Sequence, residues 1–446
     1  EALELDDRQA ILRAADAILA RDPTQAEGLY IAGMAFFRME NRGLASVLLN
    51  AASQVKPEQG AIWNNLGCVL EDWHPKEALA MLRRALQAEP GLQPAMQNMV
   101  GVLSQLGRWD ESLKLADEYL KQYPNDPDVT YNSALVLMQL GRWKEAFPRW
   151  RAGLGRKFRK EINYHKDAPT PRWEGQKDAK VVIYGEQGLG DEILGAAMFE
   201  RAAATGAEII IDCDERLEKL FARSFPDLTV HGTRKAVERP WVEDEKPTHR
   251  LECIGLGELF APEPFRVRPF LKADPALRAM CRAWLDALGP GMKVGLAWTG
   301  GVLEWDRADR CIPEGGLGPI VTSPNCQFVS LEYLDGPVPP GVHQAKWATA
   351  KGVDYDLTAA LIAELDLVIS VPTTVVDAAG ALGTPCWVMV PTVPQWRFAE
   401  AAGDKAWVYE NVDIYRRLGG NWLPTVAKVA KHLRAYSKPQ RLEAAE

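Results

Sequence analysis

The sequence is poor in histidine and cysteine, and neither residue type is arranged as a ligand set or a disulfide framework. The 446 residues include six histidines, which show no metal-ligand spacing, and seven cysteines without a C-x-x-C pair. An odd, scattered set of cysteines excludes a zinc knuckle and a disulfide-stabilised secreted scaffold. We therefore expect reduced thiols in a cytoplasmic protein, and no metal site.

The sequence also lacks an excess of positive charge and any long hydrophobic run. Lys and Arg number 52 against 60 Asp and Glu, giving a net charge of −8, which is the wrong sign for broad capture of nucleic acid or anionic lipid. No run approaches the ~18 apolar residues that a membrane-spanning helix needs, and no basic segment followed by an apolar stretch begins the chain. We expect a soluble protein that is neither secreted nor membrane-spanning, without a nucleic-acid partner.

The first third of the chain contains an internal repeat. Four prolines, each after a stretch with amphipathic helical periodicity, are spaced 34, 33 and 34 residues apart: Pro23, Pro57, Pro90 and Pro124. The turn Leu-Gly-Arg-Trp occurs twice, 34 residues apart, starting at Leu106 and Leu140. Small residues recur where helices must approach closely: Gly33, Gly67, Ala45, Ala78, Ser112 and Ala146. A single helix pair cannot bury its apolar face alone, so such pairs are expected to stack.

This pattern resembles the tetratricopeptide repeat, and Ala61–Gly67 matches the first-helix signature of that family. We expect a leading helix at about residues 6–21 and four helix pairs ending near residue 153, which form an all-α superhelix over residues 1–153. The aromatic residues of the array are expected to pack between helices: Tyr30, Phe36, Trp63, Trp109, Tyr131 and Trp143. The concave groove of such an array suits an extended peptide or another protein, so a protein partner is implied.

From Lys180 onward, short apolar runs alternate with helical stretches, which is typical of parallel strands with crossover helices. The expected strands are 181–184, 208–212, 228–230, 294–298, 328–331, 367–370 and 386–390. They predict an α plus α/β protein, in which the helical array precedes two Rossmann-like domains.

The domain boundaries follow from the same runs. After a linker at 154–178, we place an N-terminal Rossmann-like domain at 179–290 and a C-terminal one at 291–446. A helix at 277–291 ends in Gly-Pro-Gly and is the natural hinge, and a closing helix at about 424–436 belongs to the second domain.

A glycine-rich junction follows the first expected strand. Gly188 and Gly190 would let backbone amides approach a ligand at the start of a helix, although their spacing is not the dinucleotide fingerprint. Asp191 and Glu192 then lie in the first helical turn. Two interpretations stay open: helix capping, or a carboxylate at a cleft that accepts a proton from a hydroxyl group.

Two segments of the second domain could bind phosphate. Trp298, Thr299 and Gly300 follow its first strand, and Arg307 and Arg310 come shortly afterwards. Arginines at that position suit a bidentate grip on phosphate, although a solvated charged loop would look the same.

The other segment follows the strand at 367–370. Thr373, Thr374 and Val375 open a helix of small residues that includes Asp377. Exposed amides and hydroxyl groups at such a turn could hold a diphosphate, whereas the small residues could equally serve close packing alone.

These motifs together resemble GT-B glycosyltransferases of the heptosyltransferase-like kind. Bacterial proteins that join tetratricopeptide repeats to such a domain share this layout, including flagellin glycosyltransferases and relatives of the O-GlcNAc transferases. The resemblance rests on Glu186–Asp191, the arginine-containing loop, the strand before Thr373, the run from Gly380 to Val388, and Pro171–Gly175, which resembles the segment leading into the catalytic domain. It implies that Asp191 is the general base and Arg307 and Arg310 form the donor-phosphate loop. It also implies that Thr373, Thr374 and Val375 are the backbone cradle for the diphosphate.

The sequence departs from that family at two positions. Pro372 and Asp377 stand where the family usually carries an aspartate and a histidine. The departure puts the identity of the donor in doubt and makes a degenerate, non-catalytic domain conceivable. Asp212-Cys213-Asp214 matches a D-x-D metal motif only superficially, because it ends a strand with a buried pattern and the family generally works without a metal.

The function predicted from this resemblance is transfer of a sugar from a nucleotide-sugar donor to a hydroxyl group of a protein recruited by the repeats. The reaction is expected to be inverting and metal-independent and to need no cofactor, since the nucleotide sugar is a substrate. Glu192 is the reserve base. The alternatives are a non-catalytic repeat scaffold with a nucleotide-sugar-binding domain, or a transferase that acts on a glycan, a lipid or a modified nucleic-acid base.

Overall fold

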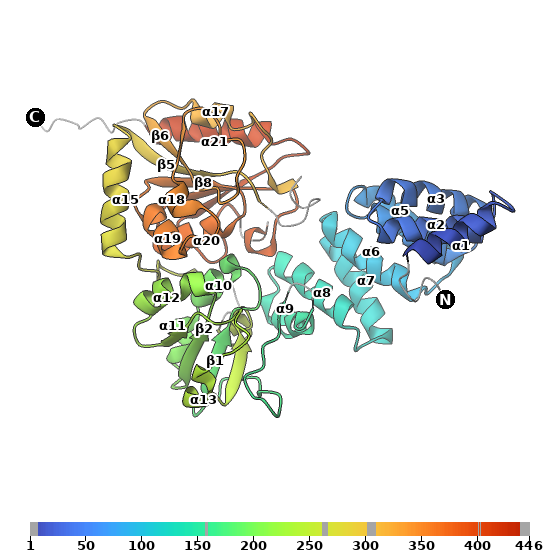
Figure 1. The fold of residues 1–446 in the computed structure, drawn as a ribbon, viewed down its shortest axis with the longest axis horizontal. Coiled ribbons are helices and arrows are strands. Elements are labelled where there is room, and N and C mark those ends of the chain that lie inside the picture. Colours follow the sequence, from blue (N-terminus) through green and yellow to red (C-terminus); the bar gives the residue numbers. More distant parts are fainter. Residues whose placement is uncertain are drawn as a thin grey trace, which may run out of the picture. The chain divides into compact units, whose positions relative to one another are not determined.

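The chain forms two compact units, Glu1–Leu137 and Met138–Glu446. The computed structural model describes residues 8–156, 159–260, 266–300, 309–399, 401 and 403–437 (Figure 1). Within these ranges, no helix combines the length and the apolar character that crossing a bilayer would require.

The first unit is a succession of antiparallel helices of similar length. They are α1 (Arg8–Leu19), α2 (Ala26–Arg38), α3 (Arg42–Val55), α4 (Gly60–Leu70), α5 (Pro75–Ala88), α6 (Gln93–Gln105), α7 (Trp109–Gln122) and α8 (Pro127–Gln139), whose end passes into the second unit. The expected leading helix and the paired helices are present. Helices approach closely at glycine as expected, because a Cβ atom at Gly67 would lie 2.9 Å from the side chain of Leu82. Trp63 is buried in this helical core.

The second unit begins with the last helix of the repeat pattern. This helix, α9 (Trp143–Trp150), continues into the single turn η1 (Arg151–Gly153). Trp143 packs edge-on against Trp407 with ring centroids 5.2 Å apart. The segment that the sequence assigns to the array, 1–153, therefore includes a helix that packs within the compact unit of the α/β domains.

The first sheet is parallel, with the strand order β3-β2-β1-β4. Its strands are β1 (Lys180–Tyr184), β2 (Glu208–Asp212), β3 (Thr229–His231) and β4 (His249–Glu252). The helical segments of this domain are α10 (Leu189–Ala196), α11 (Phe199–Ala203), η2 (Glu215–Leu217), α12 (Glu218–Ser224), α13 (Trp241–Glu245) and α14 (Leu256–Phe260). The strand β4 is an addition to the three strands expected from the sequence.

The second sheet is also parallel, with the order β10-β9-β8-β5-β6-β7. Its strands are β5 (Met292–Ala297), β6 (Cys326–Ser330), β7 (Val342–Gln344), β8 (Leu367–Ser370), β9 (Cys386–Val390) and β10 (Val412–Arg416). The helical segments of this domain include α17 (Gly318–Val321), α18 (Lys346–Thr349), α19 (Tyr355–Ala363), α20 (Thr374–Leu382), η3 (Trp396–Phe398) and α21 (Leu423–Tyr436). In Figure 1, α17 and α21 lie on one side of this sheet and α19 and α20 on the other. The sequence did not predict β7 and β10.

The helix α15 (Pro275–Ala287) leads from the first domain to the second. Asp274 caps its start by accepting the N–H groups of Ala276 and Leu277. After its end, Gly289 and Gly291 have φ angles of +96° and +108°, a region that side chains disfavour. The chain therefore changes direction at the predicted Gly-Pro-Gly segment.

The predicted fold class is confirmed: a helical repeat region precedes parallel-sheet α/β domains. Because parallel strands are covered on both faces, their central members are short apolar runs, and this explains why they could be predicted from the sequence. The segments at the carboxyl ends of those strands carry the residues that line a pocket in the second unit.

Candidate functional site

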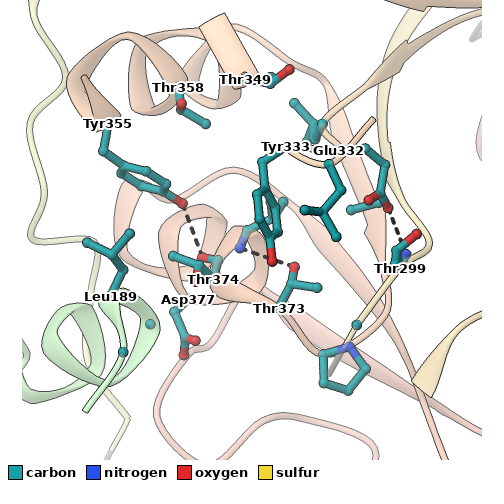
Figure 2. A pocket seen from close by; sticks show the side chains of 18 of the residues that line it. Leu189, Thr299, Glu332, Tyr333, Thr349, Tyr355, Thr358, Thr373, Thr374 and Asp377 are labelled. Atoms are coloured by element: carbon teal, nitrogen blue, oxygen red, sulfur yellow. Dashed lines mark hydrogen bonds between the residues drawn. The ribbon is translucent and has the colours of Figure 1, made fainter. Parts of the chain in front are cut away.

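A pocket of about 540 Å³ lies between the two α/β domains of the second unit. One wall comes from the start of α10 and the segments after β2 and β3, and the other from the segments that follow β5, β6, β7, β8 and β9. Ligands of open α/β sheets bind at the carboxyl ends of the strands, which is where these segments lie. Figure 2 shows side chains from both domains facing this space, with Leu189 on one side and Thr373 and Thr374 on the other.

The start of α20 forms part of the pocket wall that the C-terminal domain contributes. Thr373 is extended, with φ −143°, and its hydroxyl accepts the N–H of Val375 at 3.3 Å. The hydroxyl of Tyr355 donates to the carbonyl of Thr374 at 3.4 Å, as Figure 2 shows. The first-turn amides and the positive end of the helix dipole are thus placed at a pocket with room for an anion. Thr373, Thr374 and Val375 all line this pocket.

The start of α10 is capped by the residue that we predicted as the general base. Gly188 is the N-cap, and its N–H donates to Oδ2 of Asp191 at 3.1 Å. The side chain of Asp191 keeps 20% of its surface exposed and lines the pocket. The capping interpretation is therefore present in the structure, and a carboxylate remains accessible at the same time.

Gly190 lines the pocket and also lies at a close approach between two helices. A Cβ atom at this position would lie 2.8 Å from Oδ2 of Asp377 and 3.4 Å from Cα of Thr374. The glycine thus permits the starts of α10 and α20 to approach each other across the two domains. Gly188 has more space, since a Cβ atom there would have a carboxylate oxygen of Asp191 as its nearest neighbour, at 3.5 Å.

Arg397 is the central residue that the sequence analysis missed. Its guanidinium group forms ion pairs with Asp191 of α10 and with Asp377 of α20, the latter at 3.0 Å. It lies in the single turn η3 after β9 and belongs to no motif that spacing could reveal. Only the three-dimensional arrangement places its side chain between two carboxylates that are 186 residues apart in sequence.

Asp377 is buried beneath the pocket, with 2% of its surface exposed. Burial raises the pKa of Asp377 to about 7, and the positive charge of Arg397 opposes this rise. Burial alone would lower the pKa of Arg397, but Asp377 and Asp191 raise it overall. The hydroxyl of Tyr409 donates to Oδ1 of Asp377 at 3.4 Å. A buried carboxylate thus lies beneath the pocket, with an arginine and a tyrosine hydroxyl as its partners.

Arg310 reaches the pocket from the other side. Its guanidinium donates to the carbonyl of Pro372 at 2.7 Å. With the amide of Gln395 turned so that its oxygen faces Arg310, two further contacts of 3.2 Å form. The backbone of Pro372 therefore helps to orient the arginine that was predicted to bind phosphate. Arg307, the other predicted arginine, lies outside the described residues.

The segment after β5 is only partly in the pocket wall. Thr299 and Gly300 line the pocket. Glu332 fixes this segment by accepting the N–H groups of Trp298 and Thr299 at 2.6 and 2.7 Å. The side chain of Trp298 instead packs against the core of the second sheet. Trp298 was predicted as a donor-binding residue, but its ring lies outside the wall because it fills that core.

Glu192 does not line the pocket. Successive residues of a helix point about 100° apart, and Glu192 faces the interior of its own domain, where 2% of its surface is exposed. It accepts the N–H of Asp214 at 2.8 Å and pairs with Arg234. Burial raises the pKa of Glu192 to about 8. Its position therefore corrects the expectation that Glu192 could replace Asp191 as the base.

Asp212, the last residue of β2, and Asp214, two residues later, bind basic side chains. Asp212 accepts from Tyr164 at 2.7 Å and pairs with Arg239 at 3.0 Å. Asp214 is paired with three basic residues, Arg216, Arg234 and Lys235. In the parts of the chain that the structure describes, no group of three or more His, Cys, Asp or Glu residues is placed to hold a metal ion.

The pocket wall carries more positive than negative side chains. Among the described lining residues, the acidic ones are Asp191, Glu332 and Asp377, and the basic ones are Arg216, Arg234, Lys235, Arg310, Lys351 and Arg397. Tyr333 adds an aromatic ring that is half exposed. Arg216, Arg234 and Lys235 were not predicted, because their positions after β2 and β3 have no recognisable motif. An anionic ligand that also has a flat ring would suit this combination.

Comparison with known proteins identifies the repeat type. Residues 70–131 match the family described as tetratricopeptide repeat. The helical region of the chain is thus a tetratricopeptide repeat region. Two solved structures resemble it over 34% of this chain: YrrB, described as a tetratricopeptide repeat protein with an unusual peptide-binding site (24% identity, 78% of that chain, TM-score 0.31), and MamA (17% identity, 89% of that chain, TM-score 0.32).

One relative extends over both units. The chain is 28% identical over 460 aligned positions to Protein FlbA of Caulobacter vibrioides, an alignment that covers 94% of this chain and 74% of FlbA. The similarity therefore spans the repeats and the α/β domains together.

Proposed function

We propose that this protein is a glycosyltransferase that moves a sugar from a nucleotide-sugar donor to a hydroxyl group of a protein acceptor. One observation carries the proposal: a carboxylate from α10 and an anion-binding helix start from α20 line the same pocket. The first is suited to accept a proton and the second to hold a phosphate, and sugar transfer from a nucleotide needs both.

The phosphate groups of the donor are assigned to the C-terminal wall. The amides at Thr374 and Val375 and the hydroxyl of Thr373 lie at the positive end of α20. Arg310 adds a permanent positive charge on the same wall. These groups would stabilise the charge that develops on the departing phosphate oxygen, so the proposed reaction needs neither a metal nor a cofactor.

The acceptor hydroxyl is assigned to the side of Asp191. One oxygen of this carboxylate pairs with Arg397 and the other accepts from Gly188, but each oxygen has further lone pairs. In the proposed step, the hydroxyl group gives its proton to Asp191 and its oxygen attacks the anomeric carbon of the sugar. The bond from that carbon to the phosphate oxygen breaks and leaves its electron pair on the phosphate. Attack opposite the leaving group would invert the anomeric configuration.

The choice of a protein as the acceptor rests on the repeat region. Tetratricopeptide arrays present extended surfaces that suit peptides and proteins. The extension of the similarity to FlbA over both units supports a function that uses them together. A cytoplasmic location is part of the proposal, and the seven cysteines, all free thiols in the structure, support a reducing compartment.

The proposal is tested with the full chain and a panel of nucleotides and nucleotide sugars. A ligand present at about 100 times its dissociation constant stabilises the folded state by about 2.7 kcal/mol, so binding raises the melting temperature. Nucleotide release from the donors that bind then measures turnover, and mass spectrometry of a protein acceptor measures transfer. Absence of a thermal shift with every nucleotide and nucleotide sugar would refute the proposal.

A non-catalytic scaffold is the second candidate. It is favoured by the ion pair between Asp191 and Arg397, which engages the proposed base, and by Asp377 in place of the usual histidine. A scaffold would bind a nucleotide sugar without releasing nucleotide in the presence of any acceptor. The same panel therefore distinguishes the two functions.

A further inference from the structure

Arg397 is held by a segment that has little stability of its own. It lies in η3, a single turn of three residues, and such a turn depends on packing for its position. Its guanidinium group nevertheless connects Asp191 and Asp377, which open two helices in two domains. The groups that hold η3 therefore determine where the proposed base lies.

The neighbouring residue Trp396 provides that packing. Its ring lies edge-on to Trp143, with centroids 5.4 Å apart, and to Trp150, with centroids 6.4 Å apart. The guanidinium carbon of Arg397 lies 5.5 Å from the centre of the Trp396 ring. Edge-on aromatic pairs are favourable and have a defined geometry. Trp143 and Trp150 both belong to α9, so this helix faces the turn that carries Arg397.

The helix α9 is anchored on both α/β domains. On the C-terminal domain, Trp143 packs edge-on against Trp407 with centroids 5.2 Å apart, and Gln139 at the end of α8 donates to the carbonyl of Pro394 at 2.6 Å. On the N-terminal domain, Arg151 pairs with Glu258 through a 2.8 Å bond from Nε. The ring of Phe147 lies so close to Gly257 that a Cβ atom there would be 2.0 Å away.

These contacts assign a role to α9 that its repeat sequence does not suggest. We propose that α9 is a positioning element of the pocket: through Trp143 and Trp396 it holds Arg397, and Arg397 holds the Asp191 carboxylate against the start of α20. Arg397 is a positioning residue because it acts through Asp191. The kinetic consequence rests on the proposed transferase function, whereas the structural link does not.

The chemistry of arginine is important for this role. A planar guanidinium group can engage two carboxylates with separate N–H groups, whereas a lysine ammonium is a point charge on a flexible stem. Arg397→Lys should therefore preserve the charge of the pocket and lose the fixed geometry. The position of Asp191 should change more than the affinity for the donor, because the proposed phosphate-binding groups lie on Arg310 and α20.

The test uses the full chain with Trp143→Leu, Arg397→Lys and the double variant, and Trp73→Leu as the matched control. Trp73 is 53% exposed and belongs to the first unit. With the donor selected by the nucleotide panel, we expect each single variant to lower kcat at least tenfold while KM for the donor changes less than threefold. The double variant should be no slower than the slower single variant, because both changes break one link. Trp73→Leu should match the wild type.

Two outcomes would overturn the proposal: a decrease of kcat in the double variant that equals the product of the two single decreases, or a wild-type kcat in Trp143→Leu. Should Trp143→Leu fail to fold, Trp396→Phe keeps an aromatic ring of smaller size and replaces it in the same comparison. A crystal structure of the folded variant gives a readout that is independent of activity: the Arg397 guanidinium should have left Asp191. If the wild type has no turnover, the transferase function fails, and the crystal structure still decides the link from α9 to Arg397.

Discussion

The two compact units differ in how far apart in the sequence their defining contacts lie. In the first unit, each helix packs on its neighbours in the chain, so a period of about 34 residues is visible as spaced prolines and glycines. In the second unit, the pocket gathers residues from the segments after eight different strands. The sequence of α9 follows the repeat pattern of the first unit, but the helix packs within the second unit. A repeat can therefore end in a helix that has become part of another domain.

The largest expected effect concerns that helix. A chain of residues 138–446 keeps α9, whereas a chain of residues 154–446 loses it. Trp143, Phe147 and Trp150 are each at most 3% exposed, and removal of one such aromatic side chain typically costs about 3–5 kcal/mol. Loss of all three would be comparable with the ~5–15 kcal/mol total stability of a domain. We expect cooperative thermal unfolding, followed by circular dichroism, only for the longer chain. Equal melting temperatures would show that α9 belongs to the array alone.

The next effect separates the capping role of Asp191 from the catalytic one. Asn caps a helix about as well as Asp, so Asp191→Asn should fold normally but cannot accept the proton. We expect turnover to fall by roughly 10²–10⁴ with donor affinity nearly unchanged. The control is Asp227→Asn, at an exposed position away from the pocket. Wild-type turnover in Asp191→Asn would favour the scaffold function.

Arg310→Ala should produce a smaller loss, and in binding instead of turnover. Removal of a charge-assisted contact to phosphate costs about 1.5–3 kcal/mol, which calorimetry with the selected nucleotide would measure. The exposed Arg268 provides the matched control, Arg268→Ala, with the same change of charge. If both variants bind the nucleotide equally well, Arg310 is not part of the phosphate site.

The smallest effect is the pH dependence that Asp377 gives to the free energy of unfolding. Its pKa is raised to about 7 in the folded state, above the ~3.9 of an unfolded chain. The folded state therefore binds this proton more tightly, and the associated stability is lost as pH rises from about 4 to about 7. Asp377→Asn removes this dependence. From pH 5 to 8, denaturant unfolding should show the wild type losing about 1–3 kcal/mol relative to the variant. If the difference in unfolding free energy between the wild type and the variant stays constant over this pH range, Asp377 lies in a more polar environment.

The strands that the sequence analysis missed share one position in the sheets. The strands β4, β7 and β10 all lie at sheet edges. Central parallel strands are covered on both faces and read as apolar runs, whereas edge strands carry polar residues, as in His249-Arg250-Leu251-Glu252. Their apolar signal is therefore too weak to distinguish them from loops.

The residues of the candidate site also fall into those that could be predicted from the sequence and those that could not. Residues at the ends of predicted strands could be found, because parallel strands bring their carboxyl ends to one edge. The start of α10 and the start of α20 were identified on that basis. The orientation of a side chain was not available, so Glu192 was taken as a possible base although it faces its own domain, and Trp298 was assigned to a wall that its ring does not reach.

The sequence by itself determined the repeat period, the α/β character of the remainder and the strand ends where a ligand could bind, because each depends on contacts or patterns within a few tens of residues. The tertiary structure decided the rest. It joined Asp191 and Asp377 through Arg397, turned Glu192 into the core and packed α9 against Trp396. Those contacts connect segments that are far apart in the chain, and their geometry depends on how the domains pack together, which no local pattern records.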